Sequence, residues 1–224
     1  MMNVHRVLPG KKVLMVGSGN VALIVSYQFL LAGAEVVAIV EALPEIGGYI
    51  IHAAKLRRAG VPILTSSTLH KAVGKESVEE AVICSLDDNF SPVKGSERTL
   101  EVDLICLAVG LSPLAELCWV AGCEFKHLPE LGGFVPIHNE SMRTTVSHLY
   151  VAGDVAGVEE ASSAMEEGKL AGVGVAEDLG YLEKDEAKKS KEEIKRRIGS
   201  LRLGPFGDMR AKVKAELLNA GSRI

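Results

Sequence analysis

A glycine-rich run near the start of the chain has spacing that can do chemistry. Residues 17–22 read G-x-G-x-x-A, follow the apolar stretch 12–16 and open a stretch of helical length. In such a turn the first glycine permits a tight bend and the second lets a pyrophosphate approach the backbone. The small third residue lets the helix pack closely, and the helix N-terminus offers N–H groups to the anion. The predicted cofactor-binding residues here are Gly17, Ser18, Gly19, Asn20, Val21 and Ala22.

Glu41 lies 22 residues after Gly19, at the end of the second predicted strand. A carboxylate at this place can accept hydrogen bonds from both hydroxyl groups of an adenosine ribose. It would also repel a 2′-phosphate, and the segment 42–48 contains no arginine. We therefore predict NAD rather than NADP, with an empty Rossmann-like fold as the alternative.

A second pattern, HLYVAGDVAG, covers residues 148–157. It predicts a short strand at 149–152 that ends at Gly153 and Asp154 and leads into a helix. An aspartate at a strand end can hydrogen-bond a ribose or ribityl hydroxyl, while the glycine lets the backbone come close. This pattern predicts part of a flavin site.

The elements that must position these residues alternate between strand and helix. Continuous apolar strands followed by helices of the β-α-β-α-β type fold into a parallel sheet. The remainder of this region predicts a three-stranded antiparallel meander and then a buried strand. The predicted strands are 12–16, 35–41, 61–67 and 103–109, the helices are 20–33 and 45–60, and the meander covers 68–101.

A second region predicts a smaller α/β part and a charged tail. It contains a short helix near 113–121, a turn and strand at 128–137, the strand 149–152 and a helix near 160–179. Its charged sequence predicts that the tail forms solvated helices, with docking to a partner as the less favoured alternative. The whole is an α/β protein with three predicted parts: an NAD-type Rossmann-like domain at 11–110, part of an FAD-type domain at 111–181, and a helical tail at 182–224.

Composition excludes several classes of function. The net charge of −4 and the aromatic fraction of 4% argue against nucleic acid binding. No apolar run approaches the ~20 residues of a membrane span, and no signal peptide is evident, so a cytoplasmic location is expected. The six histidines are scattered, so neither a metal site nor a catalytic side chain is predicted. The cysteines, including the C-x4-C of Cys118 and Cys123, are assigned to core packing, with a redox disulfide as the less favoured alternative.

Two further stretches have alternative interpretations. The acids Glu159, Glu160, Glu166 and Glu167 either tune a flavin edge or form a solvated face, and the solvated face is favoured. The G-x-G at Gly172 and Gly174 has no strand before it. It predicts tight helix packing rather than a second nucleotide site.

The order of these motifs resembles the pyridine nucleotide–disulfide oxidoreductase superfamily of FAD/NAD-linked flavoproteins. The resemblance rests on KVLMVGSGNVAL with Glu41, VDLICLAVGLSP, TTVSHLYVAGDVAG and EEASSAMEEGKLAG. It is strongest for the branch with the alpha subunits of sarcosine oxidase and of bacterial amine, proline or opine dehydrogenases. The resemblance implies an NAD domain inserted into an FAD domain, with Gly110 where the chain returns toward FAD. It also implies that Gly153 and Asp154 contact the ribityl–pyrophosphate region and that the next helix points its N-terminus at the isoalloxazine.

The sequence departs from the family pattern in three places. The first G-x-G-x-x-G of the family should precede residue 12, and the chain has none there. A fragment is therefore expected, with its FAD site completed by a missing N-terminal segment or a partner subunit. Disulfide reductases of the family often carry a glutamate where this chain has Ile24, and their C-x4-C follows the first FAD turn. A thiol-disulfide reductase is therefore not favoured.

The predicted function is an FAD-dependent NAD(H) oxidoreductase, with hydride transfer between nicotinamide and flavin. It includes the role of electron-transfer subunit beside a substrate-oxidising subunit in a heteromeric amine or amino-acid dehydrogenase. The alternatives are an isolated NAD-binding domain without activity and a non-catalytic NAD-binding subunit that serves assembly.

Overall fold

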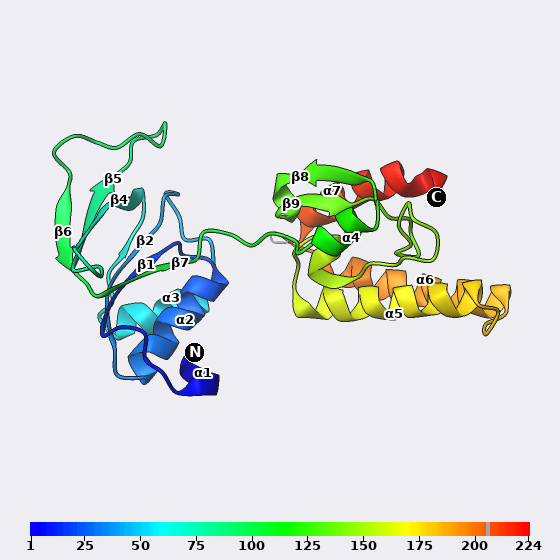
Figure 1. The fold of residues 1–224 in the computed structure, drawn as a ribbon, viewed down its shortest axis with the longest axis horizontal. Coiled ribbons are helices and arrows are strands. Elements are labelled where there is room, and N and C mark those ends of the chain that lie inside the picture. Colours follow the sequence, from blue (N-terminus) through cyan, green and yellow to red (C-terminus); the bar gives the residue numbers. More distant parts are fainter. Residues whose placement is uncertain (205–206) are drawn as a thin grey trace. The chain divides into compact units, whose positions relative to one another are not determined.

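The computed structural model describes residues 1–204 and 207–224, which form two compact units (Figure 1). Unit 1 comprises Met1–Val109 and unit 2 comprises Gly110–Ile224. Each unit has its own buried apolar clusters. Within the described residues, no helix combines the length and apolar character that crossing a bilayer requires.

Unit 1 is built on a parallel sheet of four strands in the order β3-β2-β1-β7. Figure 1 shows helices α2 and α3 on one face of this sheet and a three-stranded antiparallel sheet, in the order β4-β5-β6, on the other. The elements are α1 (Met2–His5), β1 (Lys12–Val16), α2 (Asn20–Leu31), β2 (Glu35–Val40), α3 (Ile50–Arg58), β3 (Ile63–Leu64), β4 (Ser67–Val73), β5 (Glu80–Ser85), β6 (Arg98–Glu101) and β7 (Leu104–Leu107).

The sequence of β1 explains why both faces of the sheet are covered. Val13 and Met15 pack with the buried residues of α2 and α3, whereas Leu14 and Val16 pack with Ala81 and other buried residues on the opposite side. Successive side chains of a strand point to opposite faces, so the four consecutive apolar residues 13–16 need cover on both sides. The two layers supply that cover.

The predicted β-α-β-α-β order and the antiparallel meander are confirmed. Two bounds differ. The third strand is only Ile63–Leu64, because Ser67 already belongs to β4. The second helix begins at Ile50 rather than at residue 45, because the preceding backbone is held against the first turn. There Gly47 N–H donates to Ser18 Oγ at 2.9 Å, and Tyr49 N–H donates to Asn20 Oδ1 at 2.8 Å.

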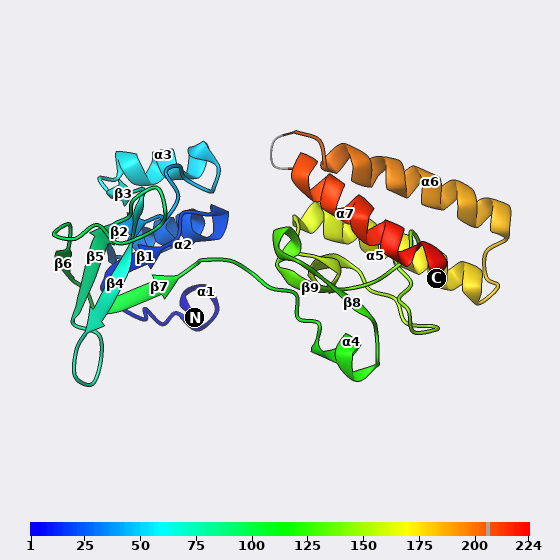
Figure 2. The same ribbon diagram turned by 90° about the horizontal axis from the view of Figure 1, so that it is seen from above.

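Unit 2 combines a β-hairpin with the helices α4, α5, α6 and α7, of which α5 and α6 lie side by side (Figure 2). Its main core joins residues of the helices, such as Leu170 and Ile198, to loop residues such as Met142. The elements are α4 (Glu116–Val120), β8 (Phe125–Leu128), η1 (Pro129–Leu131), β9 (Gly133–Pro136), η2 (Gly153–Ala156), α5 (Ala161–Asp178), α6 (Lys184–Leu201), α7 (Asp208–Ala220) and η3 (Gly221–Arg223).

The predicted strand at 149–152 is wrong. Within the described residues, its backbone pairs only through an isolated bridge between Tyr150 and Arg143. A strand needs a neighbour along its whole length, and here the segment instead buries Val151 against the helices.

The solvated interpretation of the tail is also wrong. Ile194 and Ile198 of α6 and Leu217 of α7 are buried, and so is the amine-bearing Lys214. The charged residues of α6 and α7 therefore form outer faces of helices whose inner faces complete the core of unit 2. The tight packing predicted for the second G-x-G is confirmed at Gly174, where an added Cβ would lie 3.0 Å from Ser141 O, but not at Gly172, where it would have no neighbour within 4 Å.

Candidate functional site

The turn after β1 requires glycine at its first position. Gly17 has φ +102°, and an added Cβ would lie 2.3 Å from the carbonyl oxygen of Ala108. The turn therefore lies directly against the chain that leaves β7. The N–H of Gly17 donates to Val40 O at 2.8 Å, which continues the pairing of β1 with β2 into the turn.

Gly19 opens α2 with free space beside it. An added Cβ would have no neighbour within 4 Å, so nothing in the fold itself demands a glycine at this position. Within the described residues, the N–H groups of Gly19, Asn20 and Val21 have no acceptor. Helix N-terminal N–H groups of this kind bind anions well, because they add to the positive end of the helix dipole. Open space and free donors together fit a pyrophosphate.

Glu41 lies beside this turn and has a structural role that the sequence pattern does not reveal. Its Oε2 accepts hydrogen bonds from Ser18 N–H at 2.8 Å and from Ser18 Oγ at 2.6 Å. Its Oε1 accepts a hydrogen bond from Leu43 N–H at 3.0 Å. A carboxylate has about four lone-pair sites, so some acceptor capacity remains for a ribose hydroxyl. Glu41 thus fixes the turn and keeps free acceptor capacity.

The other predicted residues of the turn divide into inner and outer groups. Ser18 and Ala22 are fully buried, and Ala22 packs in the core under α2. Val21 is 53% exposed. Gly48, which sequence reasoning missed, closes the inner side of the turn, since an added Cβ would lie 2.9 Å from Asn20 N. Its signal was the Gly47-Gly48 pair at the end of the loop.

The second predicted motif forms a tight turn in unit 2. Gly153 has φ +76°, and its N–H donates to Glu167 Oε2 at 3.0 Å. Asp154 is exposed, and its carboxylate has no partner among the described residues. Gly110, the first residue of unit 2, has φ +140° and open space at its Cβ position. The turn therefore presents a free carboxylate next to a backbone that only glycine readily adopts.

A cluster of four buried charges lies behind this turn and joins it to the tail. Arg202 Nη2 and Lys214 Nζ lie 2.8 Å and 2.9 Å from Glu167 Oε1. Arg202 Nε lies 3.0 Å from Glu159 Oε2, and Lys214 Nζ also donates to Ala156 O at 2.7 Å. Each of the four side chains is at most 13% exposed. Two acids and two bases therefore neutralise each other inside unit 2.

This cluster corrects the interpretation of the acidic run as a solvated face. Only Glu160 of the four acids is well exposed, with 59% of its side chain accessible. Glu166 pairs with Lys169 and Arg197, whose hydrogen bonds hold the pKa of its carboxyl below the ordinary value. Glu159, Glu166 and Glu167 therefore bind cations of the tail, and only Glu160 largely faces water.

The thiols of Cys118 and Cys123 lie close together, and a hydrogen bond between them helps to raise the pKa of Cys118. All four are free thiols, and Cys118 and Cys123 are buried. Burial is the main cause that raises the pKa of Cys118, so it stays a thiol and a poor nucleophile at neutral pH. Among residues 1–204 and 207–224, no group of three or more histidine, cysteine or acidic side chains is arranged to hold a metal ion.

Comparison with known proteins shows the family to which the chain belongs. Residues 2–168 match the family described as pyridine nucleotide-disulphide oxidoreductase. The chain belongs to this family. Its members are oxidoreductases that use FAD and NAD(P)H, so the resemblance predicted from the motifs is confirmed at the level of the superfamily.

Individual relatives are more distant. A NADH oxidase of Methanocaldococcus jannaschii is 27% identical over 74% of this chain and 37% of its own length. An opine oxidase subunit of Rhizobium meliloti is 30% identical over 77% of this chain and 41% of its own length. The thioredoxin reductase of T. acidophilum superposes with a TM-score of 0.65 at 22% identity, over 75% of this chain and 53% of that chain. This last likeness confirms the predicted fold class. The chain spans less than half the length of the two curated relatives.

Replacing Glu167 should destabilise unit 2. A Glu167→Gln variant keeps an acceptor for Gly153 N–H but leaves Arg202 and Lys214 buried with one counter-charge fewer. We expect a loss of about 3 kcal/mol in the free energy of unfolding. Urea denaturation followed by the emission of Trp119, which packs on Phe125 at 4.6 Å between ring centroids in unit 2, measures it. Glu160→Gln is the matched control. Equal stabilities of the two variants would contradict the stabilising role of Glu167 in the cluster.

Acid should also weaken unit 2, through His138. This residue is 1% exposed, and burial, aided by the charges of Lys214 and Arg202, lowers its pKa from 6.5 to about 4. Between these values the unfolded chain binds a proton that the folded chain does not bind, so stability is present above pH 6.5 and is lost as the pH falls.

From about pH 7 to about pH 5 we expect a decrease of about 2 kcal/mol in the free energy of unfolding. The same denaturation experiment measures it. A His138→Leu variant should lose most of this pH dependence of the free energy of unfolding. An unchanged pH dependence in that variant would show that other groups cause the effect.

Proposed function

We propose that unit 1 binds NAD(H) at the turn Gly17–Ala22. The observation that carries this proposal is the combination at Gly19 of open space with unpaired N–H groups at the start of α2. The turn faces the carboxyl edge of a parallel sheet, where ligands of α/β proteins commonly bind. The family's use of NAD(P)H supports the same assignment.

We infer a preference for NADH over NADPH. Glu41 presents a carboxylate where the adenosine ribose would lie, and its position is fixed by Ser18 and Leu43. A 2′-phosphate would meet this negative charge. The loop that follows, residues 42–49, carries neither lysine nor arginine to compensate for it.

We further propose that unit 2 contributes one part of an FAD site. Asp154 would hydrogen-bond a ribityl or ribose hydroxyl, and Gly153 and Gly110 would let the backbone come close to the cofactor. The remaining contacts would come from another segment or a partner subunit, which the partial coverage of the relatives supports. When both cofactors are bound, they supply hydride transfer between nicotinamide and flavin. The side chains of this chain would bind and orient them.

The resulting function is an FAD-dependent NAD(H) oxidoreductase or its electron-transfer subunit. The opine oxidase relative is one subunit of its enzyme, which supports a role beside a substrate-oxidising subunit of an amine or amino-acid dehydrogenase. The finer resemblance to sarcosine oxidase alpha subunits belongs to this proposal. A chain that binds NADH but never flavin would instead favour the NAD-binding subunit that serves assembly.

The first test of the NAD(H) site is Gly19→Ala. The added methyl group meets nothing in the protein, so folding should be unchanged, but it occupies the space where the pyrophosphate approaches. We expect NADH affinity, measured by isothermal titration calorimetry, to fall at least about tenfold. Gly168→Ala, also without a neighbour at its Cβ position, is the matched control and should bind NADH normally. Equal affinities of the two variants would remove Gly19 from the site.

The second test uses the ratio of NADH to NADPH affinity in Glu41→Arg. This change also breaks the hydrogen bonds to Ser18, but that loss affects both ligands alike. The ratio therefore isolates the contact at the 2′ position, and we expect it to shift toward NADPH by about tenfold or more. A ratio equal to that of the original chain would exclude Glu41 from ribose recognition.

A further inference from the structure

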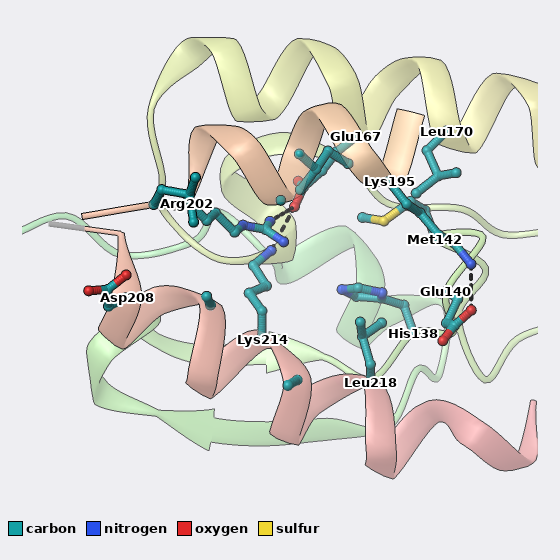
Figure 3. A pocket seen from close by; sticks show the side chains of 15 residues that line it. His138, Glu140, Met142, Glu167, Leu170, Lys195, Arg202, Asp208, Lys214 and Leu218 are labelled. Atoms are coloured by element: carbon teal, nitrogen blue, oxygen red, sulfur yellow. Dashed lines mark hydrogen bonds and ion pairs between the residues drawn. The ribbon is translucent and has the colours of Figure 1, made fainter. Parts of the chain in front are cut away.

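Unit 2 contains a pocket of about 400 Å³ that the proposed cofactor contacts do not use (Figure 3). Its walls come from the segment 138–142 and from helices α5, α6 and α7. Apolar side chains make up much of the surface, among them Met142, Leu170, Ile198 and Leu218. A cavity of this size and character is typical of sites for small organic molecules.

The charged side chains of the pocket balance each other. Three carboxylates and three cations line it: Glu140, Glu167, Asp208, Lys195, Arg202 and Lys214. Glu167 lies within 3 Å of both Arg202 and Lys214, and Lys195 pairs with Glu140. Figure 3 shows these pairs at the margins of the space, with the apolar side chains between them. Asp208 accepts a hydrogen bond from Gly204 N–H at 3.1 Å. A negatively charged occupant would therefore meet no cation that lacks a counter-ion, which favours a neutral molecule over an anion.

One polar atom of the lining has no partner. His138 Nδ1 lies 3.0 Å from the carbonyl oxygen of Asn139, which can only accept, so Nδ1 carries the proton. Nε2 is then an acceptor, and it is buried without a hydrogen bond among the described residues. The residue is 1% exposed, and Figure 3 shows its ring pointing into the pocket toward Lys214. A buried acceptor without a donor is costly, and a ligand that supplies the donor removes that cost.

We propose that this pocket binds a small, neutral, largely apolar molecule whose hydroxyl group donates a hydrogen bond to His138 Nε2. A phenol is the simplest member of this class, since it combines one hydroxyl donor with an apolar body. The proposal is independent of the cofactors and does not rest on the function proposed above.

The test compares phenol with toluene, which has nearly the same shape but carries a methyl group in place of the hydroxyl. Dissociation constants for both are measured on the full 224-residue chain by protein chemical-shift titration. Toluene is the more hydrophobic probe, so a purely apolar cavity would bind it more tightly than phenol. We expect phenol to bind about tenfold more tightly than toluene, because only phenol satisfies the acceptor.

Two variants separate the hydrogen bond from the cavity. His138→Phe should keep toluene binding, which shows that unit 2 is folded, and should lose the preference for phenol. Ala211→Leu, on the α7 wall of the pocket, should fill the space and abolish binding of both probes. Failure of both probes to bind the original chain would overturn the proposal. A preference for phenol that survives His138→Phe, or binding that survives Ala211→Leu, would overturn it equally.

Discussion

The hydrogen bond from Gly17 N–H to Val40 O is the interaction on which the turn Gly17–Ala22, the proposed nucleotide site, depends. It extends the register in which Val16 lies beside Val40 on one side and beside Leu107 on the other. Because parallel strands end at the same edge, the turn, Glu41 and the chain leaving β7 are brought together there. The contact of Gly17 with Ala108 O leaves no room for a side chain, so the glycine is required by the sheet itself. Gly19, by contrast, is not required by the fold, and the proposed pyrophosphate contact would account for it.

Unit 2 is organised around a different constraint, the neutralisation of buried charge. Glu167 accepts a hydrogen bond from Gly153 on one oxygen and binds Arg202 and Lys214 with the other. A single side chain therefore connects the turn proposed to contact flavin with the end of α6 and with α7. Removing water from four charges is expensive, and the arrangement persists because each charge has an opposite partner within the cluster. The tail is thus a part of the unit that carries the second motif.

The sequence was sufficient for the features that depend on local pattern. The apolar run of β1, the glycine spacing after it and the helical length of the stretch that forms α2 together predict the parallel sheet and its turn. The pattern could not show that Glu41 also holds Ser18, because that contact exists only once the strands are in register. Nor could it show that Glu167 is buried, since its cations follow 35 and 47 residues later. The apolar segment 149–152 reads as a strand, but only the fold decides whether a neighbouring strand is present.

The most direct test of this account is an NMR titration of the isotopically labelled chain with NADH. If the turn Gly17–Ala22 binds the pyrophosphate, the largest amide shifts occur at Gly19, Asn20 and Val21, smaller ones occur near Glu41, and unit 2 amides around Gly153 stay unchanged. Shifts centred on the Gly153 turn, or the absence of any shift at millimolar NADH, would contradict the assignment of the nucleotide site to unit 1.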